Sequence, residues 1–207
     1  MSSSPTLRLD GVGIGTLSGV SLAVAPGEIH CLSGPSGSGK SRLLRAVADL
    51  EPHAGEVWLG ELAQASLPAH AWRARVMLVP AESQWWADGV GEPFPSPPAA
   101  EDLAALGFEE AVLGWQVARL SSGEKQRLAL LRAITREPAA LLLDEPTANL
   151  DEATTLAVEA WLLTRLRARG WPALWVAHDP AQIARVAARH WRIRGIALSP
   201  EEVRPWR

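Results

Sequence analysis

The sequence predicts an α/β protein with a mostly parallel central sheet flanked by helices, an antiparallel β edge and a small helical subdomain. Strand-like and helix-like stretches alternate along most of the chain, and parallel strands need such helical crossovers. A glycine-rich loop joins a buried apolar stretch to a helical one. The length of 207 residues suits a single domain, residues 1–207, that carries a subdomain.

Residues 1–80 are expected to supply the first part of the core. Leu7–Leu9 and Val20–Val24 are short apolar stretches that predict edge strands, separated by the glycine-rich Gly11–Gly15. The other elements expected here are a buried strand at Glu28–Ser33, a helix from Ser41 to about Leu50, and strands at Val57–Leu59 and Val76–Val79.

Residues 81–121 interrupt the alternation, because their prolines and glycines disfavour regular strands and helices. We expect two short helices there, at 101–107 and 109–113, in a small inserted subdomain. The core resumes over residues 122–207. Its expected elements are helices at Gly123–Arg136, Glu152–Arg169 and Ala181–Ala188 and strands at Ala140–Leu143 and Ala173–Ala177.

Composition limits the class of protein. The formal net charge of −3 gives no reason to expect nucleic-acid binding. Cys31 is the single cysteine, which excludes an intrachain disulfide and favours a reducing compartment. The sequence has neither an apolar run that could span a bilayer nor the pattern of a signal peptide. We therefore expect a cytoplasmic protein that can still dock onto a membrane protein.

Residues 34–41 fit the phosphate-binding pattern G-x-x-x-x-G-K-[ST] and lie between a strand and a helix, as that pattern requires. Glycines let backbone N–H groups face phosphate oxygens, and the helix N-terminus adds partial positive charge. We expect Lys40 to reach the β- and γ-phosphates and Ser41 to bind Mg²⁺. A glycine-rich turn without a ligand is the alternative. The residues are Gly34, Pro35, Ser36, Gly37, Ser38, Gly39, Lys40 and Ser41.

Two carboxylates follow the apolar strand expected at residues 140–143. Ligands bind at the carboxyl ends of strands in open parallel sheets, and this is where Asp144 and Glu145 lie. We expect Asp144 to hold Mg²⁺ through its water shell and Glu145 to polarise the attacking water. A strand followed by a solvated acidic turn is the alternative.

A second candidate anion site is formed by Ser121, Ser122, Gly123 and Glu124. This run places N–H groups at the start of a helix, as the first loop does. One nucleotide hardly needs two such sites in one subunit. The economical explanation is a dimer, in which this loop closes on the γ-phosphate held by the partner. A serine N-cap on an amphipathic helix is the alternative.

Together these motifs resemble the ATP-binding cassette ATPases, the nucleotide-binding subunits of ABC transporters, over nearly all of the chain. Residues 34–41 resemble the Walker A motif and residues 140–145 the Walker B motif. Residues 120–124 resemble the Leu-Ser-Gly-Gly-Gln signature, with Ser122 and Glu124 in place of the first Gly and the Gln. The resemblance implies a P-loop NTPase fold of ABC type, with ATP and Mg²⁺ as cofactors.

The resemblance also assigns roles to single residues. Residues 148–151 resemble the D-loop, which implies that Asp151 lies at a dimer interface. His178 matches the switch histidine, which implies a contact with the γ-phosphate. Catalysis is then expected from Glu145, His178 and Lys40. Two copies, or this chain and a related ATPase, are expected to sandwich two MgATP, each completing the other's site.

Two family contacts are altered here. Family members usually carry an aromatic residue that stacks on adenine, but its position falls around Gly13–Gly15, with Ile14 closest. The Q-loop glutamine, which touches Mg²⁺ and the attacking water, falls on Ala81, with Glu82 next. We expect Glu82 to supply an oxygen ligand to Mg²⁺, and Gln84 is the alternative if the loop is shifted.

Trp85 and Trp86 lie where the family's subdomain receives a coupling helix of the membrane permease. Two adjacent tryptophans in a largely polar stretch predict an exposed anchor for that helix. A small core of the subdomain is the alternative. We expect a peripheral subunit on the inner face of the cell membrane, with a permease as partner and no nucleic acid.

The expected function is ATP hydrolysis that drives a conformational change in a separate permease. An ATP-binding switch, or a soluble ABC-type ATPase with little turnover, is the alternative. A monomeric P-loop kinase would not explain the signature loop, the D-loop or His178.

Overall fold

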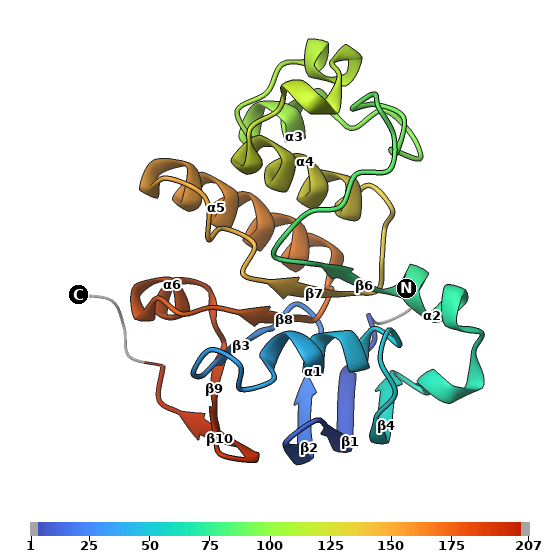
Figure 1. Ribbon diagram of the computed structural model, residues 1–207, viewed down its shortest axis with the longest axis vertical. Coiled ribbons are helices and arrows are strands. Elements are labelled where there is room, and N and C mark those ends of the chain that lie inside the picture. Colours follow the sequence, from blue (N-terminus) through green and yellow to red (C-terminus); the bar gives the residue numbers. More distant parts are fainter. Residues whose placement is uncertain (1–3, 204–207) are drawn as a thin grey trace.

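The computed structural model describes residues 4–203 and contains two sheets (Figure 1). The strands of the larger sheet are β3 (Ile29–Ser33), β6 (Val76–Val79), β7 (Ala140–Asp144), β8 (Ala173–Val176), β9 (Arg189–Arg194) and β10 (Ala197–Glu201). The strands of the smaller sheet are β1 (Leu7–Ile14), β2 (Leu17–Val24), β4 (Ala54–Leu59) and β5 (Leu62–Ala63). The orders are β10-β9-β3-β8-β7-β6, parallel except for the β9–β10 hairpin, and β2-β1-β4-β5, which is antiparallel.

The central strands are apolar throughout because both faces of the larger sheet are covered. Side chains alternate along a strand, so Leu141 and Leu143 of β7 join one core cluster while Ala140 and Leu142 join another. Each of these four side chains is fully buried. The strand that ends at Asp144 is therefore held from two sides.

Helices cover the two faces of the larger sheet (Figure 1). Buried residues of α1 pack with the antiparallel sheet in one cluster, and those of α4 and α5 pack in the other. The α-helices are α1 (Lys40–Val47), α2 (Ala69–Arg75), α3 (Ala100–Ala105), α4 (Ser122–Ile134), α5 (Glu152–Arg169) and α6 (Pro180–Val186). The 3-10 helices are η1 (Gln64–Ser66), η2 (Glu110–Gly114) and η3 (Val117–Arg119).

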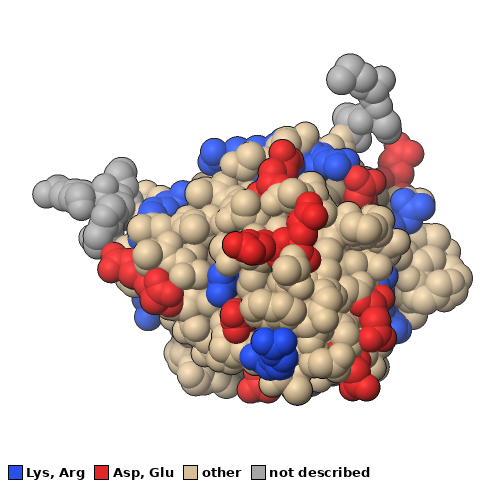
Figure 2. Space-filling view, turned by 90° about the horizontal axis from the view of Figure 1, so that it is seen from above, with Lys and Arg blue, Asp and Glu red and all other residues tan. Residues whose placement is uncertain are grey.

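Residues 81–121 pack on only one of the two clusters. Their buried apolar side chains, such as Leu103 and Val112, belong to the cluster of α4 and α5. Asp102 attaches α3 to α5, because its Oδ1 accepts hydrogen bonds from Trp161 Nε1 (2.6 Å) and Arg165 Nε (2.7 Å). Figure 2 looks onto the molecule from this side, where acidic side chains gather. Arg119 is the only basic residue in this segment.

The structure confirms the expected fold class, and α5 and β6 have the predicted bounds. Some local predictions were wrong. Gly11–Gly15 do not separate two edge strands, because β1 continues to Ile14 through shifts in register, and β1 lies inside its sheet between β2 and β4. Glycines permit such irregularities at little steric cost. The second short helix is the 3-10 helix η2.

Six elements were not expected from the sequence: β5, η1, α2, η3, β9 and β10. The helix α2 is short, and the β9–β10 hairpin lies at the edge of the sheet, where exposed strands tolerate charged residues. Charged side chains therefore hid the apolar signal of β9. Among residues 4–203, no helix is both long and apolar enough to cross a membrane.

Candidate nucleotide-binding site

The loop Gly34–Ser41 leaves the carboxyl end of β3 and enters α1. Gly34 and Gly39 have φ angles of +152° and +99°, which side-chain-bearing residues rarely adopt. A Cβ at Gly34 would lie 3.0 Å from the side chain of Ile193, and one at Gly39 would lie 3.2 Å from Leu17. The glycines of this loop are thus needed for backbone conformation and for close packing.

Lys40 lies inside the loop. Its side chain is nearly buried, and its Nζ donates hydrogen bonds to the carbonyl oxygens of Gly34 and Pro35, both at 3.0 Å. Burial lowers the pKa of Lys40, while the carboxylates of Glu145 and Asp144 oppose the shift. The ammonium group is therefore poised beside the start of α1, where backbone N–H groups also point outward. No side chain caps this helix N-terminus, since its N-cap is Gly39.

Asp144 ends β7 next to this loop. Burial raises its pKa, and the nearby Ser41 hydroxyl and Lys40 ammonium oppose that shift. Its Oδ1 is buried and has no hydrogen-bond partner among the described residues. A buried carboxylate oxygen without a donor is costly unless a cation neutralises it.

These residues fit Mg²⁺. The cation prefers oxygen ligands and usually takes one or two from the protein, the rest coming from water and phosphate. Asp144 and Ser41 offer two such oxygens. Within residues 4–203, no group of three or more His, Cys, Asp or Glu side chains could hold a metal ion by itself. A cation here would thus depend on a bound phosphate.

Glu145 and His178 form a pair at the carboxyl ends of β7 and β8. The Nε2 of His178 lies 2.8 Å from Oε1 of Glu145, within hydrogen-bond distance. Glu145 has a φ of +48°, an uncommon value for a residue other than glycine, and such outliers cluster at functional sites. Its N–H donates to the Val176 carbonyl of β8 (3.2 Å), which fixes this turn. Both side chains remain partly exposed, so a ligand can reach them.

The signature-like loop closes on itself. The N–H and hydroxyl of Ser121 both donate to Oε2 of Glu124 (2.8 and 2.7 Å), and the Glu124 N–H donates to the Ser121 hydroxyl (3.3 Å). These bonds lower the pKa of Glu124. They form a capping box at the start of α4. The serine N-cap that the sequence left as an alternative is therefore present.

Asp151 has a similar role at α5, where its carboxylate accepts hydrogen bonds from the N–H (3.0 Å) and hydroxyl (2.6 Å) of Thr154. Within residues 4–203, no hydrogen bond or ion pair joins Ser121, Glu124 or Asp151 to the loop Gly34–Ser41. The structure thus brings together the first loop, Asp144, Glu145 and His178, and leaves the signature-like loop apart.

Glu82 is not brought into this group. It is exposed, and its side chain makes no hydrogen bond or ion pair to another described residue. Gln84 is also exposed and donates only a long bond (3.4 Å) to the Glu82 carbonyl. A buried glutamine that the sequence analysis missed, Gln126, links α4 to the end of β6 through a hydrogen bond to the Pro80 carbonyl (3.1 Å). The sequence signal that could have revealed Gln126 is an amide side chain among the apolar residues of α4.

One of the two adjacent tryptophans, Trp85, packs against the core, and the other, Trp86, is exposed. Trp85 packs against the core cluster of α4 and α5, whereas Trp86 is 68% exposed. The guanidinium of Arg132 lies over both rings, 4.7 and 4.5 Å from their centroids. A groove of 490 Å³ runs beside Trp86, and basic side chains line it together with apolar ones. The basic residues are His70, Arg73, Arg132 and Arg136.

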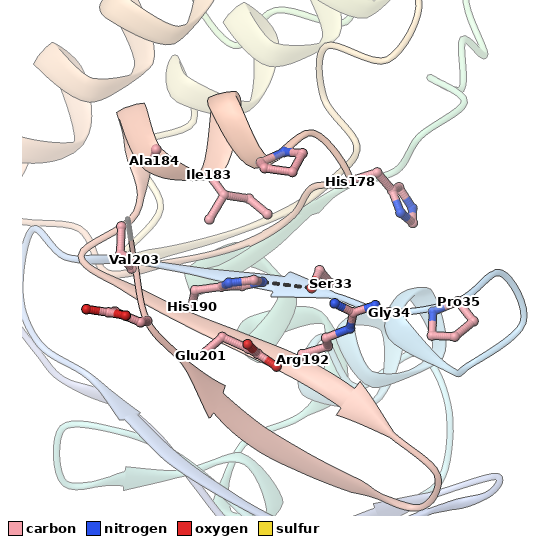
Figure 3. A pocket seen from close by; sticks show the side chains of 12 residues that line it. Ser33, Gly34, Pro35, His178, Ile183, Ala184, His190, Arg192, Glu201 and Val203 are labelled. Carbon is pink, nitrogen blue, oxygen red and sulfur yellow. Dashed lines mark hydrogen bonds between the residues drawn. The ribbon is translucent and has the colours of Figure 1, made fainter. Parts of the chain in front are cut away.

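A second cavity, of 360 Å³, lies behind the first residues of the loop, between β3, α6 and the β9–β10 hairpin (Figure 3). Ser33, which precedes Gly34, is hydrogen-bonded to Nε2 of His190 (2.7 Å) on the side of the cavity formed by the paired strands β3 and β9. Burial lowers the pKa of His190. The bond ties the start of the loop to β9.

Comparison with known proteins agrees with this geometry. Residues 17–148 match the sequence profile of the family described as ABC transporter. The chain belongs to the ABC transporter family. It is 39% identical over 190 residues to the aliphatic sulfonates import ATP-binding protein SsuB of Cupriavidus necator, a match covering 88% of this chain and 61% of that protein. It thus spans less than two thirds of that relative.

A second ABC relative is the lipoprotein-releasing system ATP-binding protein LolD 1 of Rhodospirillum rubrum. Identity is 38% over 191 residues, covering 81% of this chain and 82% of that protein. A solved ATP-binding cassette dimer, in a post-hydrolysis state with ADP and Pi, gives a TM-score of 0.81 at 22% identity. That match covers 97% of this chain and 100% of the other. At this identity the likeness establishes the ABC ATPase fold.

Proposed function

We propose that this chain is the ATP-hydrolysing subunit of an ABC transporter and that it drives a separate membrane permease. The observation that most strongly supports this proposal is that four side chains lie together around the glycine loop: Lys40, Asp144, Glu145 and His178. Residues 1–80 and 122–207 would form the core and residues 81–121 the signature subdomain. The subunit would act in the cytoplasm, at the inner face of the membrane.

The phosphate chain of ATP binds along Gly34–Ser41. Lys40 exchanges its two loop carbonyls for the β- and γ-phosphates, which compensates the burial that lowers its pKa. Mg²⁺, when bound by Ser41 and Asp144, supplies positive charge to the phosphates. Glu82 is a candidate further ligand if its loop moves inward.

Glu145 orients the attacking water and accepts its proton, because its carboxylate lies at the γ-phosphate end of the site. His178, paired with Glu145 at 2.8 Å, donates a hydrogen bond to the γ-phosphate. Together with Lys40, it stabilises the charge that develops on the transferred phosphoryl group. The positive φ of Glu145 supports this role, since uncommon backbone conformations of this kind cluster at functional sites.

Two copies bind head to tail, so that Ser121, Ser122, Gly123 and Glu124 of one face the γ-phosphate held by the other. Asp151 lies at the same interface. The separation of this loop from the rest of the site in a single chain supports a shared site. Hydrolysis removes the contacts across the interface, and the dimer reopens.

The test compares Glu145→Gln with Glu137→Gln. Glu137 has almost the same backbone conformation (φ +49°) but pairs with Arg169, so it is a matched control. We expect Glu145→Gln to lower Mg²⁺-dependent ATP turnover by about 100-fold or more while ATP binding persists. The variant should accumulate as an ATP-bound dimer on a sizing column, and Glu137→Gln should behave like the wild type.

An unchanged turnover in Glu145→Gln would contradict the assigned role. Binding of ATP without turnover in the wild type, in the presence of its permease, would favour the second candidate, an ATP-binding switch. The altered signature, with Ser122 and Glu124, is the observation that favours this candidate.

Trp86 is proposed as the anchor for the permease. Its exposed ring borders the groove of 490 Å³, whose basic rim suits a helix with apolar side chains and carboxylates. We expect Trp86→Ala to reduce recovery of the chain with its permease-containing membranes without changing ATP binding. Trp58→Ala is the matched control, since Trp58 also lies under an arginine, Arg8, but in the antiparallel sheet. Equal recovery of both variants would contradict this assignment.

A further inference from the structure

The turn between β1 and β2 carries no aromatic side chain that could stack on a base. Only Gly15 and Thr16 separate the two strands, and Gly15 adopts a φ of +61°. The place beside this turn is filled instead by Arg42, from the first turn of α1. A Cβ added to Gly15 would collide with Nη1 of Arg42 and lie 3.1 Å from its Cζ. Gly15 therefore makes room for the guanidinium.

Glu51 fixes the orientation of this guanidinium. Nε and Nη2 of Arg42 both lie 2.9 Å from Oε1 of Glu51. One edge of the planar group is thus occupied by a carboxylate, and its Nη1 and Cζ lie beside Gly15. The Arg42 side chain is nevertheless 51% exposed. Glu51 also faces Arg45 at 3.7 Å, so one carboxylate is shared by two guanidinium groups, and Arg42 keeps the positive charge that a cation–π contact uses.

The position of the turn indicates which part of a nucleotide would reach Arg42. Asp144, Glu145 and His178 mark the γ-phosphate end, on the β7–β8 side of β3. The β9–β10 hairpin lies on the opposite side of β3. The β1–β2 turn adjoins that hairpin, since the Ser18 N–H donates to the Ile196 carbonyl (2.9 Å), and Leu17 packs against Gly39. The nucleoside end must leave the loop toward this rim.

We propose that Arg42 is the nucleobase platform of the site: its guanidinium, held by Glu51 beside Gly15, stacks on the purine of bound ATP. The inference rests on the proposed function. A planar guanidinium stacks on aromatic rings through cation–π and dispersion contacts. Such stacking recognises the face of a base and not its hydrogen-bonding edge, so ATP and GTP are expected to bind with similar affinity.

The test measures binding of ATP, GTP and inorganic tripolyphosphate to wild type, Arg42→Ala, Arg42→Lys and Arg45→Ala by calorimetry. We expect Arg42→Ala to weaken ATP and GTP binding by about threefold to thirtyfold, the range for cation–π contacts, without affecting tripolyphosphate. Arg42→Lys keeps the cation but loses the planar group, so it should weaken binding of both nucleotides to a smaller extent. Arg45 lies on the same helix and also faces Glu51 (3.7 Å), but it does not cover Gly15, so Arg45→Ala should change nothing.

Each other outcome has a definite meaning. Equal weakening of tripolyphosphate would make Arg42 a phosphate ligand and overturn the proposal, as would full ATP affinity in Arg42→Lys, which keeps the charge without the plane. Unchanged ATP affinity in Arg42→Ala would overturn it too. If the wild type bound neither ATP nor tripolyphosphate, the proposed function itself would fail. Gly15→Ala offers a second route, because it should displace Arg42 and reproduce the base-specific loss.

Discussion

Two helix N-termini in this molecule carry related motifs but differ in how they are satisfied. At α1 the N-cap is Gly39, no side chain caps the helix, and the charge nearby is the ammonium of Lys40. At α4 the N-cap is Ser121, and the carboxylate of Glu124 already occupies its N–H and hydroxyl. The first terminus is left open to an external anion, whereas the second holds an internal one.

This difference indicates that the two helix N-termini have different roles in nucleotide binding. A nucleotide can bind at α1 without rearranging the chain beyond Lys40. Binding of a phosphate at α4 must compete with Glu124, whose hydrogen bonds lower its own pKa and favour its charged form. In the proposed dimer, ATP thus binds first at the open terminus and engages the capped one only on closure.

Among substitutions at the two helix N-termini, Lys40→Ala is expected to have the largest effect, a loss of ATP affinity. It removes the cation from the open terminus of α1. Because a charge-assisted contact to phosphate is lost, ATP affinity should fall by about tenfold to a hundredfold in calorimetry. Lys125→Ala, which removes the other lysine of the chain from α4, serves as control. If the two variants bound ATP equally well, the α1 terminus would not be the primary site.

The next prediction concerns the free energy of unfolding and the glycines before the N-terminus of α1. Gly39→Ala should lower the free energy of unfolding by about 1–3 kcal/mol, because a φ of +99° strains an alanine and its Cβ would press on Leu17. Gly37→Ala is a matched substitution at φ +75° with open space around it. Urea unfolding should show a smaller loss for Gly37→Ala, and an equal loss would mean that contact with Leu17 does not matter.

At the capped terminus, Glu124→Ala should lower the free energy of unfolding by about 0.5–2 kcal/mol, since it leaves Ser121 without its partner. ATP binding to a single chain should not change. Ser122→Ala, at an exposed neighbour that does not cap the helix, should have almost no effect on urea unfolding. The comparison of the two termini would be wrong if Glu124→Ala were neutral.

The smallest expected effect is a dependence of the free energy of unfolding on pH. The pKa of Glu124 is lower in the folded chain than its ordinary value of about 4.3, so its contribution is complete above that value and is lost as pH falls through the lowered one. The stability difference between wild type and Glu124→Gln should therefore be present at neutral pH and vanish in strong acid. A difference that persists there would show that charge is not involved.

The sequence predicted the parts of the site that local pattern determines. The glycine loop follows β3, and Asp144 and Glu145 come at the end of β7; both strands have clear apolar runs. Their positions at the same edge of the sheet, with β8 between the two strands, follow from the parallel arrangement. The fold class and the bounds of α5 follow from the same periodicity. The roles of these residues in ATP hydrolysis stay predictions until the variants are measured.

The remaining features depend on contacts between distant residues. Nothing local in Arg42, Gly15 and Glu51 predicts that they meet, and the bond between Gln126 and the Pro80 carbonyl spans two elements far apart in sequence. The separation of Trp85 from Trp86 depends on how α4 packs under them. Charged side chains concealed β9, which is largely exposed, and β10 lies at the edge of the sheet, where a strand need not be apolar.

The one-sided packing of residues 81–121 has a consequence for how such a chain can change over generations. Their buried side chains join the cluster of α4 and α5 and are absent from the described cluster that holds α1 and the antiparallel sheet. Substitutions among the buried residues of this segment can therefore be absorbed by repacking one half of the interior. The half that supports Lys40 stays intact. A lineage could in this way change the surface of residues 81–121 while keeping the loop that holds Lys40.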